Sequence, residues 1–187
     1  MPSDPDSPVL RVAAILDEGH ADTDADALLA RLVVRQQAAG RRVHGLLMTR
    51  PEGRGGCGTM VLVDIATQDN YLVSQPMGSG SSSCRADPQG FARASRVLRD
   101  ALAAAPAPDL VVCNRFGGLE AEGGGFRDEL LALMLRGVPL LTVVATRHLP
   151  AWQQFSGLAT VLPADEAEVQ DWLTRCMSPS PATAPHP

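Results

Sequence analysis

The stretch "VVCNRFGGLEAEGGGFRDELL", residues 111–131, indicates the fold class of this chain. An apolar run ends abruptly at Asn114 and Arg115, five glycines fall among residues 117–125, and an amphipathic pattern begins at Phe126. Strands of parallel sheets are continuous apolar runs, because helices cover both of their faces. The stretch therefore predicts a buried strand that leads through a flexible, charged loop into a helix.

The same unit recurs along the chain. The predicted buried strands cover residues 9–16, 41–49, 109–116, 138–146 and 158–163. The predicted helices cover residues 25–40, 87–105, 125–137, 148–157 and 165–176. Two further strands around a "TQDN" turn within 59–77 read as an edge β-hairpin. We therefore expect an α/β fold of three layers, in which a mostly parallel sheet carries helices on both faces.

Length and composition favour one globular domain. Of the 187 residues 45% are hydrophobic, and we expect a single domain at 9–177 between a disordered arm at 1–8 and a disordered tail at 178–187. The apolar runs are too short to span a bilayer, and the acidic, proline-rich start does not resemble a signal peptide, so we expect a cytoplasmic protein. The net charge of −5 argues against a general nucleic-acid binder.

The chain contains no lysine, since all 16 basic residues are arginines. A Schiff-base lysine and a phosphate-loop lysine are therefore excluded. The first strand-to-helix loop, "DEGHADTDADA" at 17–27, has one glycine and five acidic residues. Each carboxylate close to a phosphate costs about 1 kcal/mol even in water, so this loop opposes a triphosphate. Its carboxylates could hold a cation, or simply suit the positive end of the helix dipole.

Two other loops suggest an anion site. The loop "GSGSSSCRADP" at 78–88 offers the hydroxyls of Ser81, Ser82 and Ser83, the planar donor fork of Arg85 and the start of a helix at Pro88. A flexible surface loop of glycine and serine remains the alternative. Directly after the glycine-rich loop at 117–125, Arg127 lies in the first turn of the next helix, where its positive charge is slightly unfavourable to the helix dipole. It could bind an anion or pair with Glu120 or Glu122.

Other candidate groups give weaker signals. None of the four cysteines forms a CxxC pair, which argues against a closed zinc site, and Cys113 lies in an apolar strand. Cys57 and Cys84 lie in loops and could be ligands or redox partners. Trp152 and Phe155 share one helical face, either as core or as a pocket wall beside His148.

The blocks "CNRFGGLEAEGGGFRDEL" and "GVPLLTVVATRHLPAWQQFSG" resemble a bacterial domain family of unknown function linked to molybdenum ABC-transporter genes. "MVLVDIAT" and "SSSCRADPQGF" match further blocks, so the likeness covers roughly residues 10–175. Where the family block has a lysine, this chain has Gly118, and Arg115 could replace that lysine. The residues that match the family blocks are Asp64, Cys84, Arg85, Asp87, Asn114, Phe116, Gly117, Glu120, Gly123, Arg127 and Trp152.

The order of elements also resembles small P-loop nucleoside triphosphatases. That resemblance implies a P-loop NTPase-like or Rossmann-like topology. In that family the strand matching 109–116 ends in acidic residues that assist magnesium, whereas here Asn114 and Arg115 stand there. The fold is then expected to be inherited without the hydrolytic apparatus.

These observations lead to three hypotheses. The first is a non-hydrolytic protein of molybdenum handling that binds a small oxyanion, molybdate or tungstate, needs no other cofactor and is linked to a molybdate ABC transporter. Its ligand-binding residues would be Ser81, Ser82, Ser83, Cys84, Arg85, Asn114, Arg115, Gly117, Glu120, Gly123, Gly124, Gly125 and Arg127, with the glycine loop closing over the ligand. The second is a divergent nucleoside triphosphatase or nucleotide-binding enzyme in which Asp17, Asp64 or Glu120 holds magnesium and arginines replace the lysine. The third is an interaction module that forms a homodimer through its edge hairpin.

Overall fold

The computed structural model describes residues 11–20, 24–49, 60–76, 84–157 and 159–177. The predicted arm at 1–8 and tail at 178–187 lie outside these ranges, as does Cys57. Among the described residues no helix is both long enough and apolar enough to cross a membrane.

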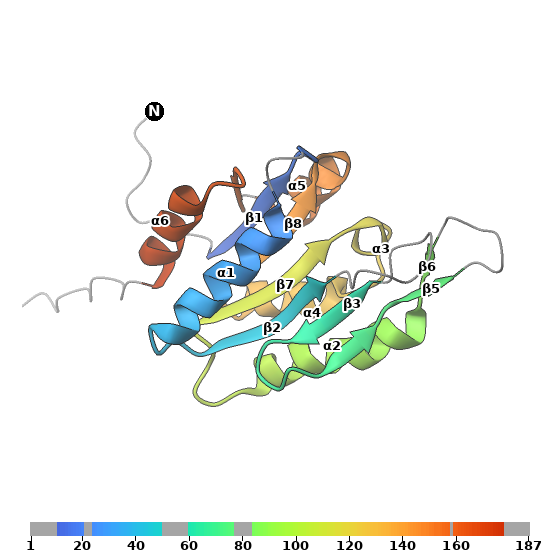
Figure 1. The fold of residues 1–187 in the computed structure, drawn as a ribbon, viewed down its shortest axis with the longest axis horizontal. Helices are drawn as coiled ribbons and strands as arrows, with labels where there is room; N and C mark the ends of the chain where they lie inside the picture. The colour runs from blue at the N-terminus through green and yellow to red at the C-terminus, as the bar shows by residue number, and fades with distance from the viewer. Residues whose placement is uncertain (1–10, 21–23, 50–59, 77–83, 158, 178–187) are drawn as a thin grey trace, which may run out of the picture.

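The described residues form one large sheet with helices on both faces (Figure 1). Its strand order is β4-β3-β2-β7-β8-β1-β9. The parallel strands are β2 (Val43–Thr49), β7 (Leu110–Phe116), β8 (Leu140–Ala145), β1 (Val12–Asp17) and β9 (Thr160–Leu162). β3 (Val61–Asp64) and β4 (Asn70–Leu72) run antiparallel at one edge. The predicted three-layer α/β fold with its edge hairpin is confirmed.

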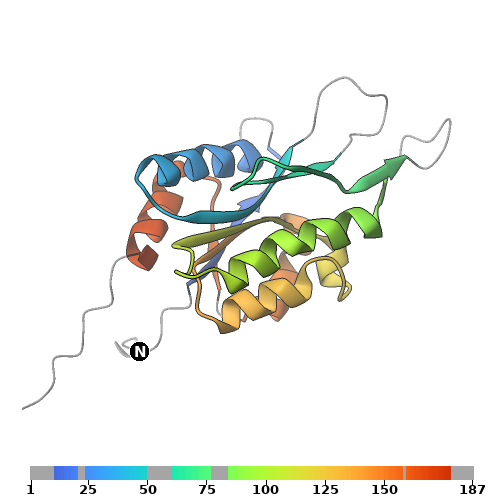
Figure 2. The same ribbon diagram turned by 90° about the horizontal axis from the view of Figure 1, so that it is seen from below.

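Two groups of helices cover the two faces, as the view in Figure 2 shows. α1 (Ala25–Ala38) and α6 (Glu166–Met177) pack on one face. α2 (Pro88–Ala103), α4 (Arg127–Leu135) and α5 (Leu149–Ser156) pack on the other. Successive residues of a strand point alternately into these two cores: Val12 and Ala14 face the α2 side, and Ala13 faces the α1 side. Both faces are thus buried, which is why the strands read as unbroken apolar runs.

The hairpin region departs from the prediction in one respect. β4 is followed by β5 (Ser74–Pro76), which pairs antiparallel with β6 (Cys84–Ala86) in a separate two-stranded ribbon. The sequence indicated a loop throughout 78–88, and this was wrong for 84–86. Three residues are too few for an alternating pattern to stand out, and serine and glycine before them mask it.

The chain order of the elements places a crevice at the carboxyl end of the sheet. β1 leads into α1 on one face, whereas its neighbour β8 leads through the short helix η1 (Thr146–His148) into α5 on the other. Ligands of open α/β sheets bind where neighbouring strands connect to opposite faces in this way. The ends of β1, β7 and β8 are therefore where a functional site is expected.

Candidate functional site

Arg115, at the end of β7, reaches across to the first loop and α1. Its Nη1 donates to Asp17 Oδ2 at 2.9 Å, and its Nη2 donates to Asp26 Oδ2 at 2.9 Å. Its Nε also donates to Asp26 Oδ1 at 3.3 Å. Burial alone would lower the pKa of Arg115, but the two carboxylates outweigh it and raise the pKa. Arg115 is thus charged and held between two acids.

Asn114 lies beside this group and is fully buried. Its Nδ2 donates to Asp26 Oδ1 at 2.9 Å, which fixes the amide orientation because the opposite one would set two oxygens against each other. Its Oδ1 has no hydrogen-bond partner among the described residues. A buried polar atom without a partner is costly, so this oxygen marks a place that a cation or a donor would stabilise.

An irregularity in β7 gives these two residues their direction. The register of β7 against β8 shifts between Cys113 and Phe116. The side chain of Thr142 in β8 replaces the missing backbone hydrogen bonds there: its Oγ1 accepts the Phe116 N–H at 3.2 Å and donates to the Cys113 carbonyl. The strand end is thereby freed from regular pairing, and both side chains reach Asp26.

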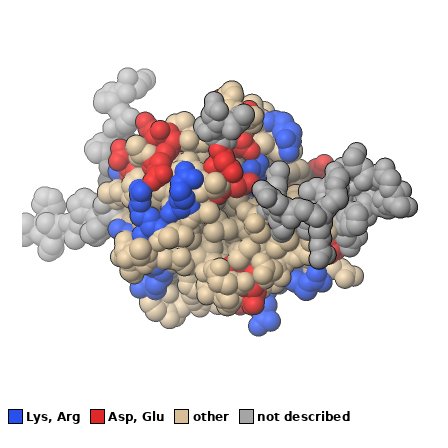
Figure 3. All heavy atoms as spheres, in the orientation of Figure 1, with Lys and Arg blue, Asp and Glu red and all other residues tan. Residues whose placement is uncertain are grey.

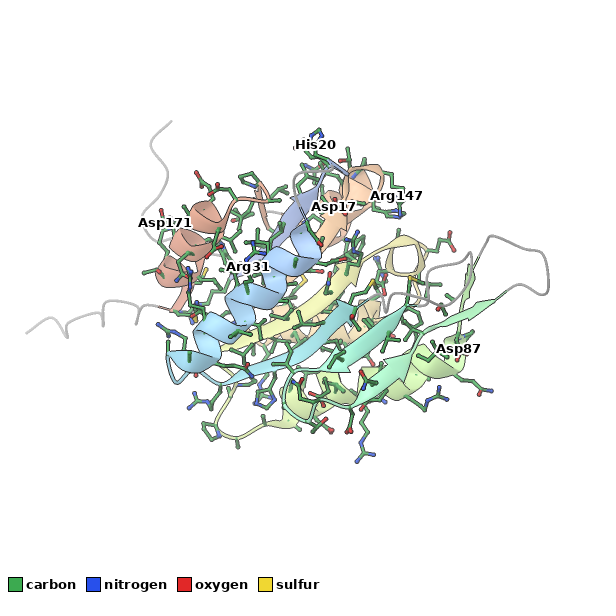
Figure 4. The ribbon with its side chains drawn as sticks, viewed as in Figure 1. Asp17, His20, Arg31, Asp87, Arg147 and Asp171 are labelled. Carbon is green, nitrogen blue, oxygen red and sulfur yellow. The ribbon has the colours of Figure 1, made fainter. Side chains whose placement is uncertain are left out.

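A pocket of about 700 Å³ opens between the first loop, α1 and the end of β2, and we call it the acidic pocket. Its lining residues are Asp17, Gly19, His20, Asp24, Ala25, Asp26, Ala27, Ala30, Leu47, Met48, Thr49, Val63 and Arg115. Arg115 is the one arginine among these described lining residues, against three aspartates. In Figure 4, Asp17, His20 and Arg147 lie at the same end of the molecule, while Asp87 lies apart at the start of α2.

The first loop has the length of a phosphate loop but different chemistry. If Gly19 is placed at the first glycine of G-x-x-x-x-G-K-[ST], Asp24 takes the second glycine's place. Ala25 then replaces the lysine and Asp26 the Ser/Thr. Asp24 caps α1 by accepting the Ala27 N–H at 2.9 Å, so the helix start is already occupied by a carboxylate. Arg115 brings to this loop, from β7, the positive charge that the loop itself lacks.

The glycine-rich loop is organised around Glu120 on the short helix α3 (Gly118–Ala121). Glu120 is 3% exposed, and its carboxylate accepts the Gly117 N–H at 2.9 Å and the Phe126 N–H at 3.0 Å. Burial raises the pKa of Glu120, and these two hydrogen bonds oppose that shift. Gly125 has a φ of 58°, and a Cβ there would collide with Glu120 Oε1, so glycine is required. Glu120 is thus a structural clamp, and its predicted role as a magnesium ligand does not fit.

Arg127 is not among the lining residues of the acidic pocket. Its guanidinium lies 4.6 Å from the centroid of the Phe155 ring, and its Nη1 donates to the Glu120 carbonyl at 3.1 Å. The backbone of Glu120, rather than its carboxylate, therefore positions this arginine. Asp64 is also engaged elsewhere: it accepts from Ala66 N–H and Thr67 Oγ1 in the turn after β3.

A second pocket, of about 240 Å³, lies on the α2 side of the sheet, and we call it the aromatic pocket. Its lining residues are Met48, Met60, Leu62, Ala86, Phe91, Asn114, Arg115, Phe116, Gly117, Gly118, Leu119, Glu120, Phe126, Ala145, Arg147 and His148. Met48 and Arg115 line both pockets. The glycines at 123–125 are not among the lining residues, so the predicted closure of that segment over a ligand does not fit this arrangement.

The structure brings together part of the predicted site. Asn114, Arg115, Gly117 and Glu120 border the same crevice. Ser81, Ser82 and Ser83 lie outside the described residues, and of Cys84 and Arg85 only the backbone in β6 is described. Sequence reasoning missed the pairing of Arg115 with Asp17 and Asp26. The signal for it was an acidic first loop after β1 together with an arginine at the end of β7, from which β8 separates β1.

Comparison with known proteins places the chain in a family. A family model matches residues 12–172. The chain belongs to the family described as "Protein of unknown function (DUF2478)". This member of DUF2478 is 35% identical over 164 residues to the Molybdenum import ATP-binding protein ModC 2 of Bradyrhizobium diazoefficiens. The match covers 87% of this chain and 18% of the length of that protein.

Two solved structures share the fold of this DUF2478 member. THEP1 from the hyperthermophile Aquifex aeolicus superposes with a TM-score of 0.62 at 15% identity, over 89% of this chain and 96% of that one. A human cancer-related nucleoside triphosphatase superposes with a TM-score of 0.59 at 15% identity, over 92% of this chain and 100% of that one. The predicted likeness to P-loop nucleoside triphosphatases is therefore confirmed at the level of the fold.

Proposed function

We propose that this domain binds a nucleotide in the acidic pocket as its magnesium complex and hydrolyses it slowly or not at all. The observation that carries the proposal is the position of Arg115, whose guanidinium stands at the first loop between Asp17 and Asp26. A phosphate can replace these carboxylates as the acceptor of the same planar fork of donors. Arg115 then does from β7 what a phosphate-loop lysine does from the loop.

The residues beside Arg115 fit a magnesium ion. Mg²⁺ is usually held by one or two carboxylates together with waters and substrate phosphates, and it needs no full protein cage. Asp17 and Asp26 would supply the carboxylates, and Asn114 Oδ1 is a neutral oxygen without a partner among the described residues. When bound, the ion would neutralise phosphate charge that the aspartates otherwise repel. Binding should therefore require the metal.

The same arrangement is poor for hydrolysis. Phosphoryl transfer depends on positive charge held around the transferred phosphate. Among the described lining residues of the acidic pocket, only Arg115 supplies a permanent positive charge. Glu120 is engaged with two backbone N–H groups and is not available as a base. A binding or regulatory role suits this site better than turnover.

Calorimetry with ATP, ADP and GTP, each with and without magnesium, tests the proposal. We expect binding with magnesium and little without it, and Arg115→Ala should weaken binding by about 1.5–3 kcal/mol, the range for a charged hydrogen bond. Arg96→Ala is the matched control, because Arg96 is exposed on α2 and pairs only weakly with Asp100. Equal binding without magnesium, or unchanged affinity in Arg115→Ala, would reject the site. Phosphate release at ordinary enzymatic rates would reject the non-hydrolytic part.

The oxyanion hypothesis is a second candidate, supported by the name of the ModC 2 relative, a molybdenum import protein. Titration with molybdate and tungstate, with sulfate and phosphate as competitors, tests it. Arg85→Ala should weaken oxyanion binding by about 1.5–3 kcal/mol if the 78–88 loop is the site. Arg127 is engaged with Phe155 and the Glu120 carbonyl, so Arg127→Ala serves as the comparison. Molybdate binding that survives Arg85→Ala would dismiss that loop.

A further inference from the structure

The aromatic pocket has the build of a separate small-molecule site. Phe91, Phe116 and Phe126 line it, and packing holds these rings in place. The Phe91 and Phe126 centroids are 5.1 Å apart, and the Phe116 ring lies 5.3 Å from Trp152 and 5.5 Å from Phe155. Rigid aromatic walls with few polar groups are typical of pockets for flat organic ligands.

One side of the pocket carries positive charge that the described residues do not neutralise. Arg147 is exposed, and its Nε donates to His148 Nε2 at 3.1 Å. No described carboxylate forms an ion pair with Arg147. Glu120 is the one carboxylate among the described lining residues of this pocket, and the Gly117 and Phe126 N–H groups occupy it. Arg115 differs in this respect, because Asp17 and Asp26 already compensate its charge.

His148 adds a hydrogen-bond donor at the same side. Because Nε2 accepts from Arg147, the proton of a neutral imidazole lies on Nδ1. Burial and the neighbouring Arg147 both lower the pKa of His148, which favours this neutral form near pH 7. A Cβ on Gly118 would lie 3.7 Å from His148 Cε1, so Gly118 faces the imidazole across a narrow space.

We infer that the aromatic pocket binds a small planar aromatic carboxylate, with its ring against the wall that Phe91, Phe116 and Phe126 form and its carboxylate on Arg147. A volume of about 240 Å³ suits one ring or two fused rings, since it is below the roughly 300–1,000 Å³ of drug-sized sites. A guanidinium pairs with a carboxylate through two parallel hydrogen bonds. The inference does not depend on nucleotide binding, because the probe ligands carry no phosphate.

Saturation-transfer NMR and calorimetry on the full chain can test this with three probes. Benzoate has both ring and charge, benzamide has the ring without the charge, and cyclohexanecarboxylate has the charge without the flat ring. We expect benzoate to bind at least roughly tenfold more tightly than either of the others, with the affinity of a fragment. Equal binding of benzoate and benzamide, or no binding of benzoate, would overturn the inference.

Two variants locate the site. Arg147→Ala should reduce benzoate affinity roughly tenfold and leave benzamide unchanged, while Arg136→Ala, at the end of α4, should change neither. Gly118→Leu should block both probes, because its side chain enters the space before His148 and its backbone is not in the left-handed region. Gly124→Leu, in the exposed part of the same loop, is the matched control. Benzoate binding that survives both Arg147→Ala and Gly118→Leu would assign it to another place.

Discussion

At the scale of single residues, what the site can bind depends on which of its polar groups already form hydrogen bonds or ion pairs with one another. Arg115 is shared by Asp17 and Asp26, and the Glu120 carboxylate is used by two backbone N–H groups. These charges therefore stabilise the fold before any ligand arrives. Asn114 Oδ1 and the outer nitrogens of Arg147 are among the groups that the described residues leave for a ligand.

Glu120→Gln should destabilise the domain by about 1–3 kcal/mol, because an amide has one acceptor where the carboxylate has two. One of the N–H groups of Gly117 and Phe126 would then face an NH₂ group. Urea denaturation of both proteins measures the loss. Glu122→Gln, at an exposed neighbouring position, should be nearly neutral. Equal stability of the Glu120 and Glu122 variants would mean that the clamp is not structural.

His148 should titrate below its ordinary value. Burial and Arg147 lower the pKa of His148 from 6.5, so the unfolded chain binds a proton more readily than the folded one. The stability that the neutral form of His148 contributes is therefore complete at pH values above the pKa of His148 in the unfolded chain. It declines as the pH falls through the pKa of His148 in the folded protein. NMR of the His148 ring proton should show a midpoint below 6.5 that moves upward in Arg147→Ala. A midpoint at or above 6.5 would contradict the environment described.

At the scale of elements, an aspartate caps the N-terminus of each of two long helices, α1 and α2. Asp24 caps α1 and Asp87 caps α2, where it accepts the Gln89 N–H at 3.0 Å. The cap at Asp87 was evident from the sequence, because proline follows it. Asp24 has a second effect, since its charge also lines the acidic pocket.

Asp24→Asn and Asp24→Ala should separate these two effects. Asparagine caps as well as aspartate, so Asp24→Asn should keep stability and improve nucleotide binding by removing a negative charge. Asp24→Ala should cost about 0.5–2 kcal/mol of stability for the lost cap. Thermal melts and nucleotide titration on the two variants provide the measurements. A large loss of stability in Asp24→Asn would show that the charge, and not the cap, matters.

The sequence predicts the main elements well and the local irregularities poorly. Long apolar runs such as 109–116 and the stripe of Leu28, Leu29 and Leu32 on α1 are explicit patterns, and the structure buries them. The shift between Cys113 and Phe116 leaves no trace in residue periodicity, because it arises from the fit of β7 against β8. The four-residue helix α3 is too short to show a helical period. The partners of Arg115 could not be chosen from sequence, since they lie 89 and 98 residues away.

At the scale of the whole molecule, the central strands of the sheet are buried between two hydrophobic cores, whereas the edge strands are partly exposed. β7, β8 and β1 are almost entirely inaccessible, whereas β4 at the edge has exposed residues. Figure 3 shows acidic side chains gathered over α6 with arginines beside them, and Glu166 there pairs with Arg31 and Arg35 of α1. Such surface pairs contribute little, so the cores carry the stability.

Hydrogen exchange should reveal this difference. Amides of β7, β8 and β1 should exchange only through global unfolding, while those of β4 and of the β5–β6 ribbon exchange through local opening at lower free energy. Mass spectrometry of exchanged peptides can rank these segments. Protection of β4 equal to that of β8 would indicate that something covers the sheet edge in solution.

The acidic and aromatic pockets have a wall in common, formed by Met48 and Arg115. A ligand in one pocket that moves the Arg115 guanidinium also changes the wall of the other pocket. Thermodynamic reciprocity then requires that each guest change the affinity of the other by the same factor. Binding in one pocket that moves Arg115 would therefore change the affinity of the other pocket.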